Sequence, residues 1–175
     1  MMQLLSDLLK LIIPASLVLY GMYLTVKLLL NREADRHRFD VQNRYTEAVV
    51  PVRLQAYERM VLFLERINPA NLLLRLGNSA STVSELQQWL LQDIRDEYNH
   101  NLSQQVYMSQ AAWDEIQAAM NDIITLINQA SGNSHPGDPA IELSKQIFER
   151  VIQRDQQPTA KALMVVKEEI QKVIL

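Results

Sequence analysis

The sequence contains no cysteine, which excludes disulfide bonds, thiolate metal sites and thiol-based catalysis. It holds only four glycines and six prolines in 175 residues, so residues that favour turns are scarce. Leucine, alanine, glutamine, glutamate, isoleucine and arginine are plentiful, and strong helix formers dominate. This composition predicts an all-α protein, and the length suits one domain with an appendage.

An excess of positive charge is also missing, since the formal net charge is −3 at pH 7. Binding to nucleic acid generally needs clustered Lys and Arg, so we expect no nucleic acid partner. The sequence lacks a G-x-S-x-G elbow, a phosphate-binding glycine loop and a dinucleotide fingerprint. We therefore predict no catalytic activity, no cofactor and no small-molecule substrate.

One hydrophobic stretch stands out near the N-terminus, where residues 11 to 26 carry no charge between two lysines. As a helix this run reaches about 24 Å, which is short of a bilayer core of about 30 Å. The lysine side chains can extend toward the headgroups, and a helix from Leu8 to Leu30 reaches about 34 Å. The stretch therefore predicts a transmembrane anchor within residues 1–30. Its anchoring residues are Lys10, Leu11, Ile12, Ile13, Leu17, Val18, Leu19, Tyr20, Tyr23, Leu24, Val26 and Lys27.

Two other interpretations of this stretch compete with an anchor. A cleaved signal peptide needs a clearly positive start and small residues at a cleavage site, whereas this segment offers Lys10 offset by Asp7 and ends in three leucines. A helix buried in a domain surface needs a polar face, whereas this stretch is apolar around its whole circumference. Both interpretations fit the residues less well than a membrane span.

Positive charge at the two ends of the stretch differs, and this predicts its orientation. Lys10 stands alone on the N-terminal side, and acidic residues that interleave on the other side matter little for topology. The positive-inside rule therefore places the C-terminal domain in the cytoplasm. The topology-determining residues at or after the C-terminal end of the span are Lys27, Arg32, Arg36, Arg38 and Arg44.

Residues 31–50 contain no strong turn signal, and they predict a polar helical stalk that continues the membrane helix. We expect Pro51 to kink or restart this helix, because proline lacks a backbone N–H and clashes with the preceding turn. Residues 51–175 then predict a helical bundle domain. No segment resembles a strand.

Five to six amphipathic helices are expected in this bundle, since apolar residues recur at three- and four-residue spacing. Helix starts are signalled at Asn68-Pro69, at a capping box of Thr82 and Glu85, and at Ser109. Asp138-Pro139 and Pro158 signal two further helix starts, and residues 131–138 predict a loop. The positions expected to face the core are Leu54, Tyr57, Val61 and Leu64; Val83, Leu86, Leu90, Ile94 and Tyr98; Trp113, Ile116, Met120, Ile123 and Ile127; Leu143, Ile147 and Val151; and Leu163, Val166, Ile170 and Val173.

Glu97 and His100 form the only pair that suggests metal chemistry, because Glu and His three residues apart share a helix face, as in di-iron bundles. Such a site needs a second Glu-x-x-His and further inward carboxylates, and the remaining histidines, His37 and His135, do not provide them. A surface or interhelix hydrogen-bonding role therefore fits the pair better. Trp89 lies beside the core position Leu90 and is a further candidate for an interaction surface.

Carboxylates are frequent on the expected helices, and two groups could form acid-base pairs. These groups are Asp93, Asp96 and Glu97, and Glu168 and Glu169. Charged residues this common on helices usually form solvated faces, and no sequence signal suggests the burial that would tune their pKa. We therefore assign no catalytic or metal-binding residue.

The segments LQAYERMVLFLERINPANLLLRL (54–76) and EYNHNLSQQVYMS (97–109) resemble a family of uncharacterised single-span proteins with a helical domain, from Bacteroidota-type bacteria. The likeness extends over most of the chain, including the anchor and the arginine-bearing stalk. It implies a bacterial inner-membrane protein of unknown activity. No catalytic residue is carried over, because the family has none assigned.

Three functions follow as hypotheses of different classes. The first is a membrane-tethered interaction or scaffold module that contacts the lipid bilayer and binds a protein partner or another copy of itself. The second is a metal-dependent bundle enzyme that uses Glu97 and His100. The third is a lipid-associated protein that organises the membrane, which rests on the arginines of the stalk.

Overall fold

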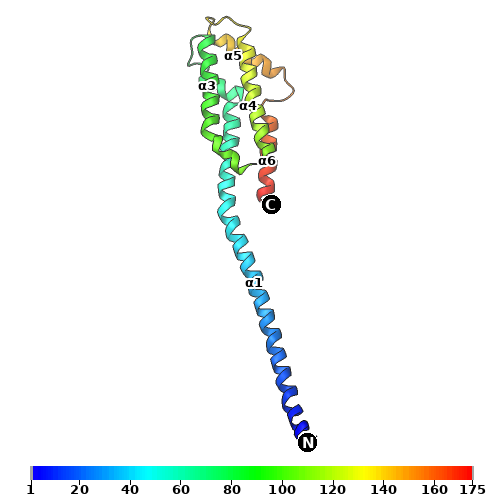
Figure 1. Ribbon diagram of the computed structural model, residues 1–175. Coiled ribbons are helices and arrows are strands. Elements are labelled where there is room, and N and C mark those ends of the chain that lie inside the picture. Colours follow the sequence, from blue (N-terminus) through cyan, green and yellow to red (C-terminus); the bar gives the residue numbers. More distant parts are fainter. Residues whose placement is uncertain (1, 175) are drawn as a thin grey trace. The chain divides into compact units, whose positions relative to one another are not determined.

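A computed structural model describes residues 2–174, with side chains described at 12, 16–30, 32, 33 and 47–172. The chain divides into two compact units, Met1–Val49 and Val50–Leu175. Within residues 2–174 there are seven helices and no strand, which confirms the all-α prediction (Figure 1). They are α1 (Met2–Ile67), α2 (Pro69–Leu76), α3 (Val83–Asn101), the 3₁₀ helix η1 (Leu102–Tyr107), α4 (Gln110–Ser131), α5 (Ala140–Ile152) and α6 (Ala160–Ile174).

In the first unit the structure describes residues 2–49 of α1, and the large apolar side chains described there up to Leu30 are exposed. Leu17, Val18, Leu19 and the large apolar residues that follow up to Leu30 are exposed. Among the residues that the structure describes, no helix is both long enough and apolar enough to cross a membrane. The transmembrane anchor is therefore not supported by the structure and stays a prediction.

Several residues named for the anchor and its orientation lie outside the described side chains. They are Lys10, Leu11, Ile13, Arg36, Arg38 and Arg44. The side chains of Lys27 and Arg32, in contrast, are described and exposed. The predicted orientation therefore remains a prediction as well.

The predicted restart at Pro51 is wrong, because α1 continues through this residue to Ile67. Within a helix, proline lacks its backbone N–H and crowds the carbonyl four residues earlier, at a cost of about 3 kcal/mol. Directly after it, Ala56, Tyr57 and Met60 are buried. Tertiary packing of this face stabilises the helix more than local propensity could destabilise it.

The last part of α1 has two distinct faces within the second unit. Its inner face is fully buried, as predicted for Tyr57 and Leu64, while Leu54 and Val61 are half-buried. The buried residues are Ala56, Tyr57, Met60, Phe63, Leu64 and Ile67. The outer face, which includes Val52, Gln55, Arg59, Leu62 and Arg66, is exposed. This strict separation follows from the 3.6-residue period of the helix.

Helix α4 lies at the centre of the remaining helices and contacts α3, α5 and α6 (Figure 1). The core positions expected on these helices are buried or half-buried, except that the side chain of Val173 is outside the description. Aromatic rings complete this core, since the Tyr98 ring lies 6.0 Å from Phe63 and 5.7 Å from Trp113, centroid to centroid. The second unit therefore has one continuous core.

Local signals fix the helix ends as expected. Thr82 and Ser109 accept hydrogen bonds from the backbone N–H of Glu85 and Ala112, at 3.3 and 3.2 Å, and begin α3 and α4. The Glu85 carboxylate reaches back to the N–H of Ser81, 2.8 Å away. The expected loop spans residues 132–139, one residue later than predicted, and its carbonyls at Pro136 and Asp138 accept from the backbone N–H groups of Ser84 and Val83 at the start of α3.

The buried core predicts a large difference between two otherwise identical substitutions. Ile123→Ala removes a fully buried side chain in α4 and should lower the free energy of unfolding by about 2–5 kcal/mol. Ile152→Ala changes a side chain that is 79% exposed and should cost less than about 0.5 kcal/mol. Urea unfolding of the full chain, followed by the intrinsic fluorescence of Trp89 and Trp113, measures both. Equal losses would contradict the core described above.

Candidate functional site

Three adjoining hollows follow the outer face of α1 in the second unit. The first, of about 590 Å³, is bounded by α1, α2 and α3. The second, of about 350 Å³, shares Leu62 and Glu97 with the first. The third, of about 450 Å³, shares Gln55 and Arg59 with the second and extends to η1. We call the three together the α1 groove.

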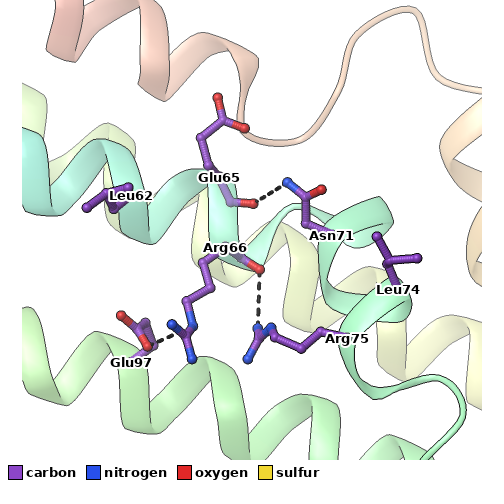
Figure 2. Close-up of a pocket in the computed structure, with 7 residues that line it drawn as sticks. All are labelled: Leu62, Glu65, Arg66, Asn71, Leu74, Arg75 and Glu97. Carbon is purple, nitrogen blue, oxygen red and sulfur yellow. Dashed lines mark hydrogen bonds and ion pairs between the residues drawn. The ribbon is translucent and has the colours of Figure 1, made fainter.

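Leucines and arginines from α1 and α2, with a glutamate from α3, line the first hollow (Figure 2). Leu62 on α1 and Leu74 on α2 are 59% and 84% exposed, so two large apolar side chains at this hollow face solvent. Arg66 at the end of α1 extends toward α3, where its Nε lies 3.0 Å from Oε2 of Glu97. The hollow therefore combines uncovered apolar surface with charged groups, as protein-binding surfaces often do.

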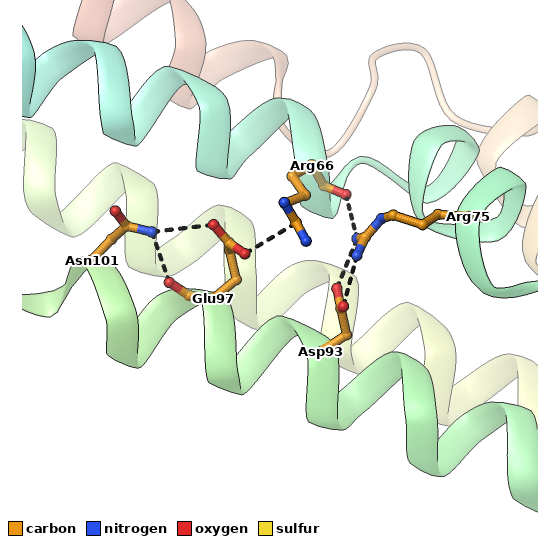
Figure 3. Close-up of polar contacts among 5 residues, drawn as sticks. All are labelled: Arg66, Arg75, Asp93, Glu97 and Asn101. Atoms are coloured by element: carbon orange, nitrogen blue, oxygen red, sulfur yellow. Dashed lines mark hydrogen bonds and ion pairs between the residues drawn. The ribbon is translucent and has the colours of Figure 1, made fainter.

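A chain of polar contacts holds the walls of this hollow in place (Figure 3). Asn101 donates to the backbone carbonyl of Glu97 at 2.9 Å, and the Glu97 carboxylate pairs with Arg66. Arg75 on α2 donates two hydrogen bonds of 2.7 Å to the Asp93 carboxylate and a longer one of 3.4 Å to the carbonyl of Arg66. Ion pairs at such exposed positions contribute little stability, about 0.2–1 kcal/mol each. Their main effect is to fix the positions of α2 and α3 beside α1.

The structure brings two of the three interaction candidates to the groove. Glu97 and His100 both line the second hollow, and the His100 side chain is exposed. Trp89 lies nearer the start of α3 and is partly exposed, but it does not line these hollows. Glu97 is engaged with Arg66, and among the described residues no group of three or more His, Asp or Glu could hold a metal ion. The metal-dependent enzyme thus gains no geometric support and stays a sequence-based hypothesis.

A second polar cluster, centred on Glu169, was not expected from the sequence. Tyr57 on α1 donates a hydrogen bond of 2.6 Å to Oε1 of Glu169 on α6. The backbone N–H of Ser109 donates to the same oxygen at 2.8 Å, and the Ser109 hydroxyl donates to Oε2. Arg53 donates to the Tyr57 hydroxyl at 3.0 Å and to the carbonyl of Tyr107 at 3.3 Å. The interpretation of Glu169 as part of a solvated face is therefore wrong, because this half-buried carboxylate joins α1, α4 and α6.

The environment of this cluster shifts two pKa values in opposite directions. Burial raises the pKa of Tyr57, and its hydrogen bond to Glu169 raises it further. Burial also raises the pKa of Glu169, but the hydrogen bonds from Ser109 and Tyr57 outweigh that effect, so the pKa lies below its ordinary value of 4.5. At neutral pH the cluster therefore consists of a carboxylate that accepts hydrogen bonds from a neutral phenol and from Ser109.

The lowered pKa of Glu169 predicts a specific dependence of stability on pH. A carboxylate whose pKa is lower in the folded state contributes stability above its unfolded pKa and loses it as the pH falls through the folded value. Glu169→Gln should therefore lower the free energy of unfolding at pH 7 by about 1–2 kcal/mol, because a neutral amide replaces the charged acceptor and its Nε2 cannot accept from the Ser109 hydroxyl. Denaturant unfolding at pH 7, 5, 4 and 3 should show this difference shrinking below about pH 4.5.

Glu168→Gln is the matched control, since Glu168 is the exposed neighbour on the same helix. It should change the stability by less than about 0.5 kcal/mol at each pH. A difference between the Glu169 variant and the wild type that stays constant from pH 7 to pH 3 would contradict the role of the carboxylate charge.

Comparison with known proteins places the chain in a family. Residues 3–173 match the family of unknown function DUF7935, which agrees with the resemblance to an uncharacterised family. The bacterial origin and the single membrane span implied by that resemblance remain predictions. Neither the curated proteins nor the solved structures contain a match to this chain. Because the match extends over nearly the whole sequence, the chain belongs to the family of unknown function DUF7935.

Proposed function

We propose that this chain is a membrane-tethered helical interaction module, in which the start of α1 anchors the protein and the second unit binds a protein partner. The observation that carries the proposal is that a single helix, α1, bears both an uncovered apolar run and the outer face of the α1 groove. The groove contains exposed apolar side chains but no apparent catalytic constellation among the described residues. Binding therefore fits it better than chemistry does.

The tether is supported by the sequence and by the exposure of α1. Leu17, Val18 and Leu19 begin a run of exposed large apolar side chains that continues to Leu30. Moving one such side chain from water into an apolar phase is favourable by about 1.5–3 kcal/mol, so a run of this length strongly favours a bilayer or another apolar cover. The lysines at positions 10 and 27 fit the two membrane interfaces.

We place the second unit on the cytoplasmic side of a bacterial inner membrane. Arginines follow the apolar run at positions 32, 36, 38 and 44, and Lys10 is the sole basic residue before it. The bias of Lys and Arg toward the cytoplasmic side supports this orientation. The resemblance to single-span bacterial proteins supports the choice of membrane.

Charge placed in the apolar run should release the protein from membranes. Leu19→Arg combined with Met22→Arg puts two charges near the centre of the run, and each costs about 2.5–3.5 kcal/mol in a membrane helix. The wild-type chain should float with membranes in a density gradient and resist extraction at alkaline pH. The double variant should appear mainly in the soluble fraction.

The control places the same charges on the second unit. Leu74→Arg combined with Ile152→Arg changes two highly exposed apolar residues there and should leave membrane flotation unchanged. If the wild-type chain is fully extracted at alkaline pH, or if both double variants behave alike, the tether is wrong. Reporter fusions at the two ends of the chain then test the orientation separately.

A further inference from the structure

We propose that the α1 groove binds the α1 helix of a second copy of this chain, so that two copies pair through the outer faces of their α1 helices. The two helices run parallel, an orientation that rests on the proposed function because both chains then enter the same membrane from the same side. This inference names the partner that the interaction module binds.

The exposed outer face of α1 has the spacing of a coiled-coil seam. Its residues alternate at intervals of three and four, which is the a and d pattern of a left-handed pair of helices. These seam residues are Val52, Gln55, Arg59, Leu62 and Arg66. In the sequence, the same intervals continue backward through Ala48, Tyr45 and Val41. The inner face of α1 is buried in its own chain, so the seam is the side that remains available for a second helix.

Charges along this seam repeat every seven residues and complement themselves. Glu58 precedes Arg59, and Glu65 precedes Arg66 in the same way. In a parallel pair, the residue before an a position on one helix lies beside the a position of the other helix. In such a pair Arg59 also faces Arg59 of the partner copy, and the Glu58 carboxylates on both sides of the two-fold axis offset this like charge. Arg66 keeps its ion pair with Glu97 of its own chain.

The described contacts leave several of these charges available for a partner. Arg66 pairs with Glu97, but Glu58, Arg59 and Glu65 form no ion pair among the residues whose side chains are described. All three side chains are exposed. An unrelated amphipathic helix could cover the apolar positions, whereas the repeated Glu-Arg pairs specifically match a second copy of the same helix.

The shape of the groove fits one helix that lies along α1. From Val52 to Arg66 the seam extends about 21 Å, which is about four helical turns. The three hollows follow this length on the side of α3 and η1, where Val106 is 74% exposed and Tyr107 is partly exposed. A second helix in the groove would cover Leu62, Val52 and Val106 together. Removal of this apolar surface from water provides the driving force, and the charges set the register.

The absence of cysteine in the natural sequence makes a cross-linking test specific. Val52→Cys and Leu62→Cys place one thiol each on the seam of the full chain, in lysates of expressing cells before the membranes are separated. A disulfide needs two Cα atoms within about 7 Å, which a parallel pair provides for identical seam positions. Mild oxidation should convert most of either variant to a disulfide-linked dimer.

Ile141→Cys and Met164→Cys are the matched controls, because these residues are 57% and 55% exposed but lie on α5 and α6. The seam variants should give about tenfold more dimer than these controls, since thiols held in contact react at an effective concentration of about millimolar. Leu62→Glu, introduced together with Val52→Cys, should reduce the yield of the 52–52 dimer to the control level.

Three results would overturn the inference. Equal cross-linking of seam and control positions would mean random collision. Cross-linking only between Val52→Cys and Leu62→Cys chains expressed together would mean an antiparallel pair. Capture of a different protein at Leu62→Cys, without the self-dimer, would mean another occupant.

Flotation of the same sample separates failure of this inference from failure of the tether. If the chain floats with membranes and no seam dimer forms, the pairing fails while the tether stands. If the chain is soluble but the seam dimer forms at both identical positions, the tether fails while the parallel pairing stands.

Discussion

Burial of one face of α1 is the constraint on which the rest of this structure depends. Tyr57, Phe63, Leu64 and their buried neighbours provide large side chains of the single core in the second unit. A helix has 3.6 residues per turn. Because one face of α1 is buried in the core, the residues of the opposite face, which recur every three or four positions, are exposed to solvent. The outer face of α1 is therefore a direct consequence of how the inner face packs.

Polar contacts then position the neighbouring helices around this face. At one end, Glu169 accepts hydrogen bonds from Tyr57 and Ser109, which joins α6 and the start of α4 to α1. At the other end, Arg66 and Arg75 connect α1 and α2 to α3. The exposed ion pairs of Arg66 and Arg75 add little stability, most of which comes from the apolar core. Their effect is to keep the walls of the α1 groove at fixed places.

Sequence patterns predicted the features that depend on local chemistry and helical period. The caps at Thr82 and Ser109 and the core positions of α3 and α4 are determined by neighbouring residues, so a single sequence suffices. Features that depend on distant contacts were not predictable. The continuation of α1 through Pro51 depends on tertiary burial. In the sequence, Glu169 cannot be told from its exposed neighbour Glu168, because only the folded chain brings α1 against it. The groove, in turn, requires three helices to be placed together. No sequence signal marked η1, a short 3₁₀ helix whose residues are largely exposed.

We propose that the two exposed parts of α1 act together, the apolar run inserting into a membrane and the outer face of the last part pairing with a second copy. The most direct test of this account is the mass of the full chain, extracted in mild detergent and measured by light scattering with the detergent contribution subtracted. The account predicts twice the chain mass of 20.2 kDa, and a return to 20.2 kDa when Leu62 is replaced by Glu. A wild-type protein that remains at 20.2 kDa at every concentration measured would contradict it.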